Sequence, residues 1–154
     1  FFRMIWIKLL FVVLSISIVI AEVSPEAFKQ DVEQGHSNRV DSLLEKQPKL
    51  LQSRFEDQNT ALHIAIAAGD KEMVLVLLDH DADVNAQNNN GDTPIHVAII
   101  NDYPDLVRII LAYNPDLTLT NDTGSPLMTA ASLERRDILN SLKQYRIAQS
   151  RTEL

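Results

Sequence analysis

Thr60-Ala-Leu-His-Ile-Ala65, Thr93-Pro-Ile-His-Val-Ala98 and Ser125-Pro-Leu-Met-Thr-Ala130 are three related hexapeptides in a chain of 154 residues. The first two begin 33 residues apart and the last two begin 32 residues apart. A period of this length is typical of solenoids, which stack supersecondary units because a single unit cannot bury its apolar face alone. The hexapeptides therefore predict a repeat architecture.

The similarity between the units extends beyond the hexapeptide. Apolar residues at 73, 74, 77 and 78 recur one period later at 106, 107, 110 and 111. This spacing places them on one face of a helix, and we expect helices over 71–80 and 105–112. Leu75 and Val76 are apolar as well, so we expect the helix over 71–80 to be buried on more than one side. Similar residues about 34 positions before the second unit indicate a degenerate first unit that begins near Ser24.

Helix starts are marked in each later unit. Thr60, Thr93 and Ser125 precede short apolar stretches and are suited to the N-cap position. Pro94 and Pro126 follow at the first helical position, where the N–H that proline lacks would have no partner. The polar, glycine-containing runs between the units are typical of projecting loops.

A Thr-Pro-Leu-His-x-Ala motif at this period resembles the ankyrin repeat family. The resemblance implies an all-α solenoid of about four helix–turn–helix units joined by hairpin loops. It also implies that His63 and His96 tie neighbouring hairpins to helices. Asp102 and Glu134 depart from the pattern because they stand where Gly69 stands, and Met128 replaces the histidine. We place the repeat domain at 22–147, with units at about 24–56, 57–89, 90–121 and 122–147 and a C-terminal tail at 148–154.

Residues 1–21 have the composition of a secretory signal peptide. They contain no acid, two basic residues and an apolar run of about 12 residues, and small residues precede a possible cleavage point after Ala21. Met4 is a possible initiator. The alternative is a retained membrane anchor, although Ile5–Ala21 is shorter than the roughly 20 residues of a spanning helix. We expect a periplasmic or secreted protein, or a membrane-anchored one if the segment is not cleaved.

Charge and short motifs bear on partners and destination. The formal charge of −7 becomes −9 once Arg3 and Lys8 are removed with residues 1–21. An acidic domain is not expected to bind nucleic acid or anionic membranes. Arg151-Thr-Glu-Leu154 loosely resembles a retrieval signal, which would place the protein in the endoplasmic reticulum lumen of a eukaryote. Asn121-Asp-Thr123 matches a glycosylation sequon and also matches an ordinary turn.

The sequence contains no pattern that predicts catalysis, a cofactor or a metal. There is no cysteine, and none of the four histidines has a partner at zinc-site spacing. Asp79, Asp81 and Asp83 alternate, but the run lacks the glycine and the final glutamate of a calcium loop. With four glycines in the chain, there is little room for phosphate-binding loops. We therefore expect a protein that is not an enzyme.

The resemblance implies binding of a protein partner through hairpin tips and the exposed face of each first helix. Ile100 and Leu133 are apolar at such positions and are candidate anchors. We expect a monomer that binds one protein of unknown identity. The matching positions are Glu56, Asp57, Asn59, Ala67, Ala68, Gln87, Asn89, Asn90, Asp92, Ile100, Asn101, Tyr103, Thr120, Asp122, Thr123, Ser132 and Leu133.

Three roles are open to such a module. The first is an exported inhibitor or immunity protein, or a stress-protective accessory in the same compartment. The second is a membrane-tethered scaffold held by residues 1–21. The third is an effector that is exported to act on a host protein.

Overall fold

The computed structural model describes residues 22–152, and the predicted signal peptide therefore lies outside the described residues. Within that range the chain forms eight α-helices and two short 3-10 helices, and its only β-type pairing is an isolated bridge between Asn121 and Gly124. The predicted all-α solenoid of four units is confirmed. The α-helices are α2 (Pro25–Glu33), α3 (Ser37–Lys46), α4 (Ala61–Ala67), α5 (Lys71–Asp79), α6 (Pro94–Ile100), α7 (Pro104–Leu111), α8 (Pro126–Ser132) and α9 (Arg136–Thr152).

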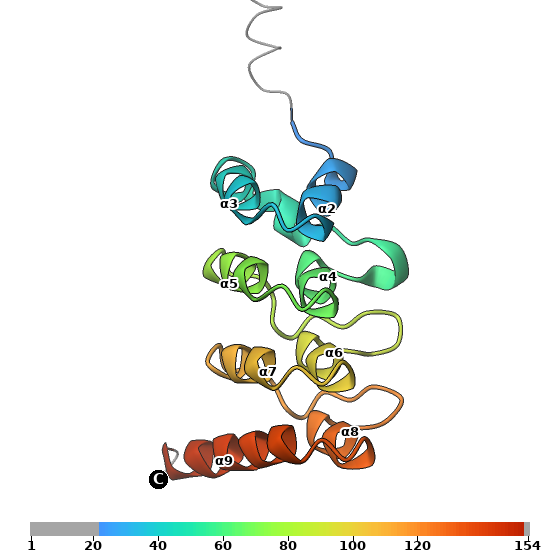
Figure 1. Cartoon of the computed structure of the whole chain (residues 1–154), viewed down its shortest axis with the longest axis vertical. Coiled ribbons are helices and arrows are strands. Elements are labelled where there is room, and N and C mark those ends of the chain that lie inside the picture. The colour runs from blue at the N-terminus through green and yellow to red at the C-terminus, as the bar shows by residue number, and fades with distance from the viewer. Residues whose placement is uncertain (1–21, 153–154) are drawn as a thin grey trace, which may run out of the picture.

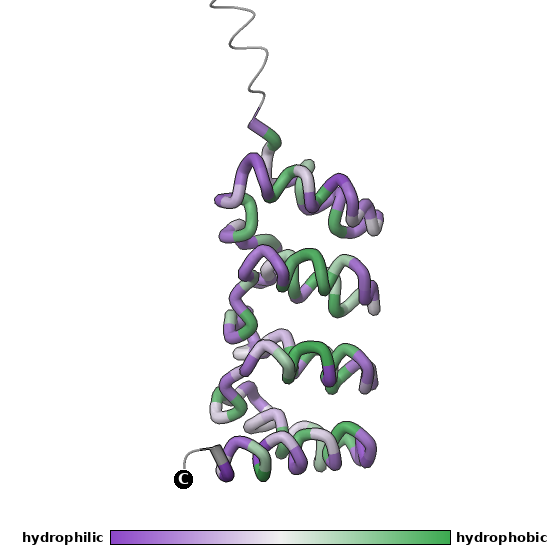
Figure 2. The backbone as a smooth tube through the Cα atoms, turned by 90° about the vertical axis from the view of Figure 1, so that its left-hand side faces the viewer, coloured by the Kyte–Doolittle hydropathy of each residue, from purple (hydrophilic) through white to green (hydrophobic). Residues whose placement is uncertain are grey.

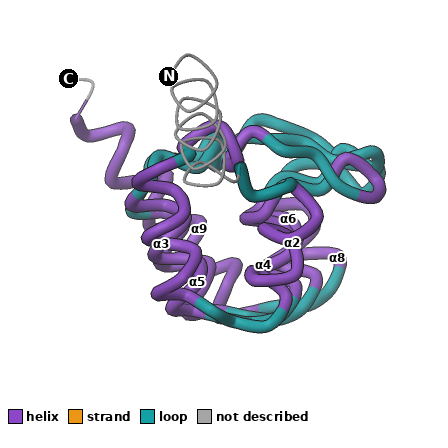
Figure 3. The backbone as a smooth tube through the Cα atoms, turned by 90° about the horizontal axis from the view of Figure 1, so that it is seen from above, coloured by secondary structure: helices purple, strands orange, loops and turns teal. Residues whose placement is uncertain are grey.

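The four helix pairs stack in two columns (Figure 1). The first helices, α2, α4, α6 and α8, form one column, and the second helices, α3, α5, α7 and α9, form the other. Loops project from one edge of these two layers, beside the first helices (Figure 3). The first of these loops carries the 3-10 helices η1 (Pro48–Gln52) and η2 (Glu56–Gln58). The first helices and the loops together make an L-shaped cross-section.

Capping explains where the first helices begin. Thr60 and Thr93 are the N-cap residues of α4 and α6, and the predicted prolines open α6 and α8. The backbone N–H groups of Thr60 and Thr93 donate to the Nδ1 atoms of His63 and His96, each over 3.2 Å. The motif histidine thus satisfies a backbone group at the start of its own helix.

The core is a continuous layer between the two columns. Met73, Val74, Leu77 and Leu78 of α5 are buried, as are the equivalent residues of α7. The most hydrophobic stretches lie along these second helices in the two middle tiers (Figure 2). Leu75, however, is 39 % exposed, so the expectation that this helix is buried on more than one side was wrong. Its position in the helical period directs it away from both neighbouring helices.

The turn between the two helices of each unit has a left-handed residue. Gly35, Gly69, Asp102 and Glu134 have φ angles of 71°, 71°, 58° and 56°. The turns at Gly69 and Glu134 form matching hydrogen bonds, since the next N–H donates to Ala65 O in one and to Ala130 O in the other. Glu134 therefore does not distort the last turn. It adopts the glycine conformation at a steric cost.

The last helix is longer than expected. α9 continues without a break through 148–152, a range that the sequence assigned to a tail. Every described side chain from Arg146 to Arg151 is exposed. This end of α9 extends beyond the column of second helices (Figure 1).

Candidate protein-binding surface

Side chains at equivalent positions fasten each hairpin to the next. The Arg54 guanidinium donates to the carbonyls of Gln58 (3.1 Å) and Gln87 (3.3 Å). One period later, the Gln87 amide donates to the carbonyls of Gly91 (2.9 Å) and Thr120 (3.0 Å). Each side chain thus joins its own hairpin to the following one. We call this series of bonds the hairpin ladder.

Asn88 closes the third hairpin from within. Its Oδ1 atom accepts from the N–H groups of Asn90 and Asp92, each at 3.0 Å, and its Nδ2 atom donates to Asn59 Oδ1 at 3.0 Å. Asn89, by contrast, takes part through its backbone, whose N–H donates to Asp57 O at 2.8 Å. The Asn88 side chain is therefore structural, while the Asn89 side chain is exposed and available for contact.

The motif histidines link each first helix to the next hairpin, as the resemblance implied. His63 Nε2 lies 3.0 Å from Asp92 O, and His96 Nε2 lies 3.1 Å from Gly124 O. Because Nδ1 of each ring accepts from a backbone N–H, the neutral ring with hydrogen on Nε2 fits both contacts. Burial lowers the pKa of both histidines below the ordinary value of 6.5, and the bond to the carbonyl opposes this only in part.

Asp92 does not belong to the accessible surface. The residue is 8 % exposed, and its Oδ1 atom accepts from Asn121 Nδ2 at 2.6 Å. The prediction of Asp92 as a contact residue was therefore wrong, because a side chain from the next hairpin covers it. The same bond occupies the amide of the Asn121 sequon, and Asn121 Oδ1 accepts from the Thr123 N–H and hydroxyl. Asn121 and Thr123 thus form an Asx-type turn that shapes the fourth hairpin.

The first helices expose two large apolar side chains at neighbouring levels of the stack. Ile100 at the end of α6 is 43 % exposed, and Leu133 at the C-cap of α8 is 39 % exposed. Ala67, Ala68, Asn101 and Ser132 are exposed at equivalent helical positions. Tyr103 is different, because it is half-buried and its ring packs over Gly69, 3.2 Å from where a Cβ atom would lie.

The remaining predicted contact residues divide into accessible tips and structural supports. Asn59 is half-buried, and its amide donates to Glu56 O at 3.0 Å. Gln87 is exposed, but its amide nitrogen is used in the hairpin ladder. The accessible tip residues are Glu56, Asp57, Asn89, Asn90, Asp122 and Thr123, with Thr120 beside them. We call these six tip residues, together with Ala67, Ala68, Ile100, Asn101, Ser132 and Leu133, the L-shaped face.

The described residues show no arrangement typical of metal binding or membrane insertion. Across 22–152, no group of three or more histidine, cysteine or acidic side chains is placed to hold a metal ion. In the same range, no helix is both long enough and apolar enough to span a bilayer. His80, at the end of α5, is paired with Asp41 at 2.7 Å.

The chain belongs to the ankyrin-repeat family. The family model described as Ankyrin repeats (3 copies) matches residues 28–121 and again residues 85–152, which together span nearly all of the described structure. Ankyrin repeats are generally modules for protein–protein interaction, and binding of a protein partner is therefore the class of function that the family supports. A search of curated proteins found no significant match.

Two structural residues were missed in the sequence. Arg54 and Asn88 were not singled out, although both hold hairpins in place. A signal did exist for Arg54, because it stands 33 residues before Gln87, which in turn stands 33 residues before Thr120. Asn88 gave no such signal, since its partners are set by the local path of the hairpin.

Proposed function

We propose that this protein is an exported, non-enzymatic binding module that engages one protein partner through the L-shaped face. The observation that carries the proposal is the exposure of Ile100 and Leu133 on adjacent first helices, beneath the projecting hairpins. Large apolar side chains at the centre of a surface, with polar groups around them, are typical anchors of protein interfaces.

Preorganisation supports this role. The hairpin tips are exposed, yet their backbones are fixed by the hairpin ladder and by the bond from Asn89 N–H to Asp57 O. A surface that is already ordered loses little conformational entropy when a partner binds. The L-shaped face therefore combines accessible side chains with a rigid backbone.

The test of the binding surface is affinity capture from the producing organism. Wild-type protein is compared with a double variant, Ile100→Asp with Leu133→Asp, after circular dichroism has shown that both are folded. Leu75→Asp is the matched control, because Leu75 is also 39 % exposed but lies on a second helix. We expect a partner that is captured by wild type and by the control and lost with the double variant. Equal capture by all three proteins would contradict the proposal.

Export is proposed from residues 1–21 and has its own measurement. N-terminal sequencing of the protein from its source should find Glu22 as the first residue. An intact segment would instead favour the membrane-tethered scaffold. Within an exported role, inhibition of a toxic protein and protection against stress differ in the identity of the captured partner.

A further inference from the structure

The floor of the L-shaped face is uncharged. The sequences of α4, α6 and α8 contain no Asp, Glu, Lys or Arg between them. Their exposed positions carry Ala67, Ala68, Ile100, Ser132 and Leu133. Electrostatic preference must therefore come from the residues around this floor.

The rim of the L-shaped face is acidic. Glu56, Asp57 and Asp122 are exposed on the second and fourth hairpins, and Glu134 follows Leu133 at the last turn. Among the described residues, the carboxylates of Asp57, Asp122 and Glu134 have no ion-pair partner, and Glu56 has a long contact of 3.5 Å with Lys29. The rim therefore carries negative charge that no neighbouring cation neutralises at close range.

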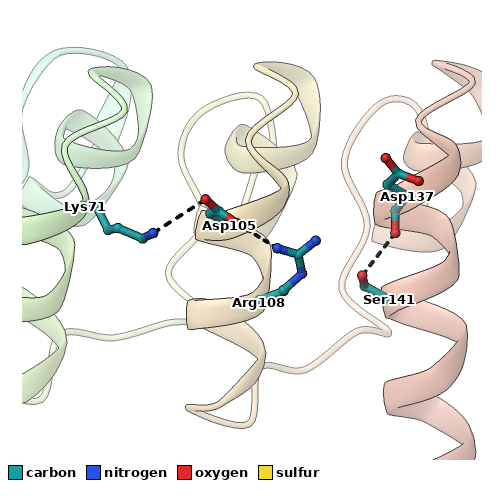
Figure 4. A network of polar contacts seen from close by, with 5 residues as sticks. All are labelled: Lys71, Asp105, Arg108, Asp137 and Ser141. Carbon is teal, nitrogen blue, oxygen red and sulfur yellow. Dashed lines mark hydrogen bonds and ion pairs between the residues drawn. The ribbon is translucent and has the colours of Figure 1, made fainter.

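Cations in this part of the chain are committed elsewhere. Residues 55–134 contain thirteen acidic residues and two basic ones, Lys71 and Arg108, which gives 2 − 13 = −11 in a chain of net charge −7. Both cations lie on second helices and both contact Asp105, at 3.5 Å and 2.6 Å (Figure 4). The flanking Arg54 and Arg135 are bound to hairpin carbonyls and to Asp102.

We propose that the partner binds the L-shaped face with a basic, amphipathic segment. Its apolar side chains cover Ile100 and Leu133, and its Lys or Arg side chains lie against the rim carboxylates. Apolar contact supplies most of the affinity, while opposite charge raises the association rate and excludes acidic or phosphorylated segments. This inference rests on the proposed function and adds the chemical class of the partner.

The first experiment is selection from a display library of random peptides of about 15 residues. The purified protein, the double variant Ile100→Ser with Leu133→Ser, and the control Leu75→Ser are each used as the immobilised target. We expect wild type and control to enrich peptides with net positive charge and at least two large apolar residues. The double variant should lose this enrichment. Selection of acidic or neutral peptides, or of none, would overturn the inference.

The second experiment measures the charge contribution directly. The most enriched peptide is labelled, and its affinity is measured by fluorescence anisotropy at about 50 mM and about 500 mM salt. The variant Asp57→Asn with Asp122→Asn keeps the shape of the tips and removes two charges. We expect about tenfold weaker binding at low salt. The difference from wild type should shrink at high salt, because salt screens exposed charges. Equal affinity of variant and wild type at low salt would overturn the inference.

These outcomes separate the inference from the proposed function. Capture that depends on Ile100 and Leu133, without selection of basic peptides, would leave the binding surface standing and remove its charge preference. Loss of both dependences would remove both proposals. A second copy of the chain is the other possible occupant, since Ile147 is 54 % exposed on α9 beside Arg146. Self-association in sedimentation, abolished by Ile147→Ser, would replace the proposed partner with that copy.

Discussion

The Nε2 atom of His63 lies 3.0 Å from the backbone oxygen of Asp92, so that one imidazole ring joins the second unit to the third hairpin. The ring forms this contact in its neutral state, with hydrogen on Nε2 and the other nitrogen accepting from Thr60. The same arrangement recurs at His96. Protonation of either ring would place a second N–H against the N–H of its own N-cap residue.

Stability should therefore fall as the pH falls below about 6.5. Burial lowers the folded-state pKa of His63 and His96 below 6.5, so the unfolded chain binds these protons first. Their contribution is fully present above pH 6.5 and is lost as the pH falls toward the lowered pKa. Urea unfolding between about pH 7.5 and pH 5 measures this slope. The double variant His63→Gln with His96→Gln should have a shallower slope over the same range, and an identical slope would show that other groups cause it.

Replacement of Glu134 by glycine should stabilise the last turn. Glu134 has a φ angle of 56°, and its side chain forms no hydrogen bond or ion pair with the described residues. Glutamate in this conformation is strained, and we expect Glu134→Gly to raise the free energy of unfolding by about 0.5–1 kcal/mol. Asp102→Gly is the comparison, since it relieves a similar φ angle but removes the ion pair with Arg135. Thermal unfolding should show a smaller gain for Asp102→Gly, and a loss with Glu134→Gly would contradict the strain argument.

Truncation of the central core should destabilise several units at once. Leu77 and Ile110 are fully buried, and changing either to alanine should cost about 2–5 kcal/mol. Leu75→Ala removes a side chain of the same volume from an exposed site on the same helix and should cost less than about 1 kcal/mol. Because neighbouring units share their core, urea unfolding should remain a single transition. Near-native stability of the Leu77 and Ile110 variants would show that these side chains do not hold the stack together.

Adjacent asparagines in the third hairpin should differ sharply. Asn88→Ala leaves the N–H groups of Asn90 and Asp92 without their acceptor and should cost about 1–3 kcal/mol. Asn89→Ala keeps the backbone bond to Asp57 and should change stability by less than about 0.5 kcal/mol. Chemical unfolding of both variants gives the comparison, and equal losses would mean that the hairpin is not fixed by Asn88. Any effect of Asn89→Ala should appear in partner binding.

The repeat made the fold largely predictable. Three copies of one hexapeptide set the register, and with it the helix starts at Thr60, Thr93 and Pro126 and the role of the two histidines. Gly69 likewise identified the left-handed position that Asp102 and Glu134 occupy. Repetition is informative here because each copy is an independent observation of the same local structure.

Exposure of single side chains was harder to predict than the fold. Leu75 was expected to be buried and is exposed, because apolar composition alone does not say which side of a helix has a neighbour. Asp92 was expected to be accessible and is covered by Asn121, a partner 29 residues away in the sequence. The contact role of the L-shaped face stays a prediction, because it depends on a partner that this chain does not encode.

The bonds between units all run in one direction. Arg54, Gln87, His63 and His96 each donate from their own unit to a carbonyl of the following hairpin. A unit moved to another position must therefore bring a donor for its successor as well as a carbonyl for its predecessor. The fourth unit cannot do so, because Met128 stands at the histidine position and thioether sulfur has no hydrogen to donate. Engineered arrays built from this chain could multiply the second and third units, but an internal copy of the fourth would leave the next hairpin unfastened.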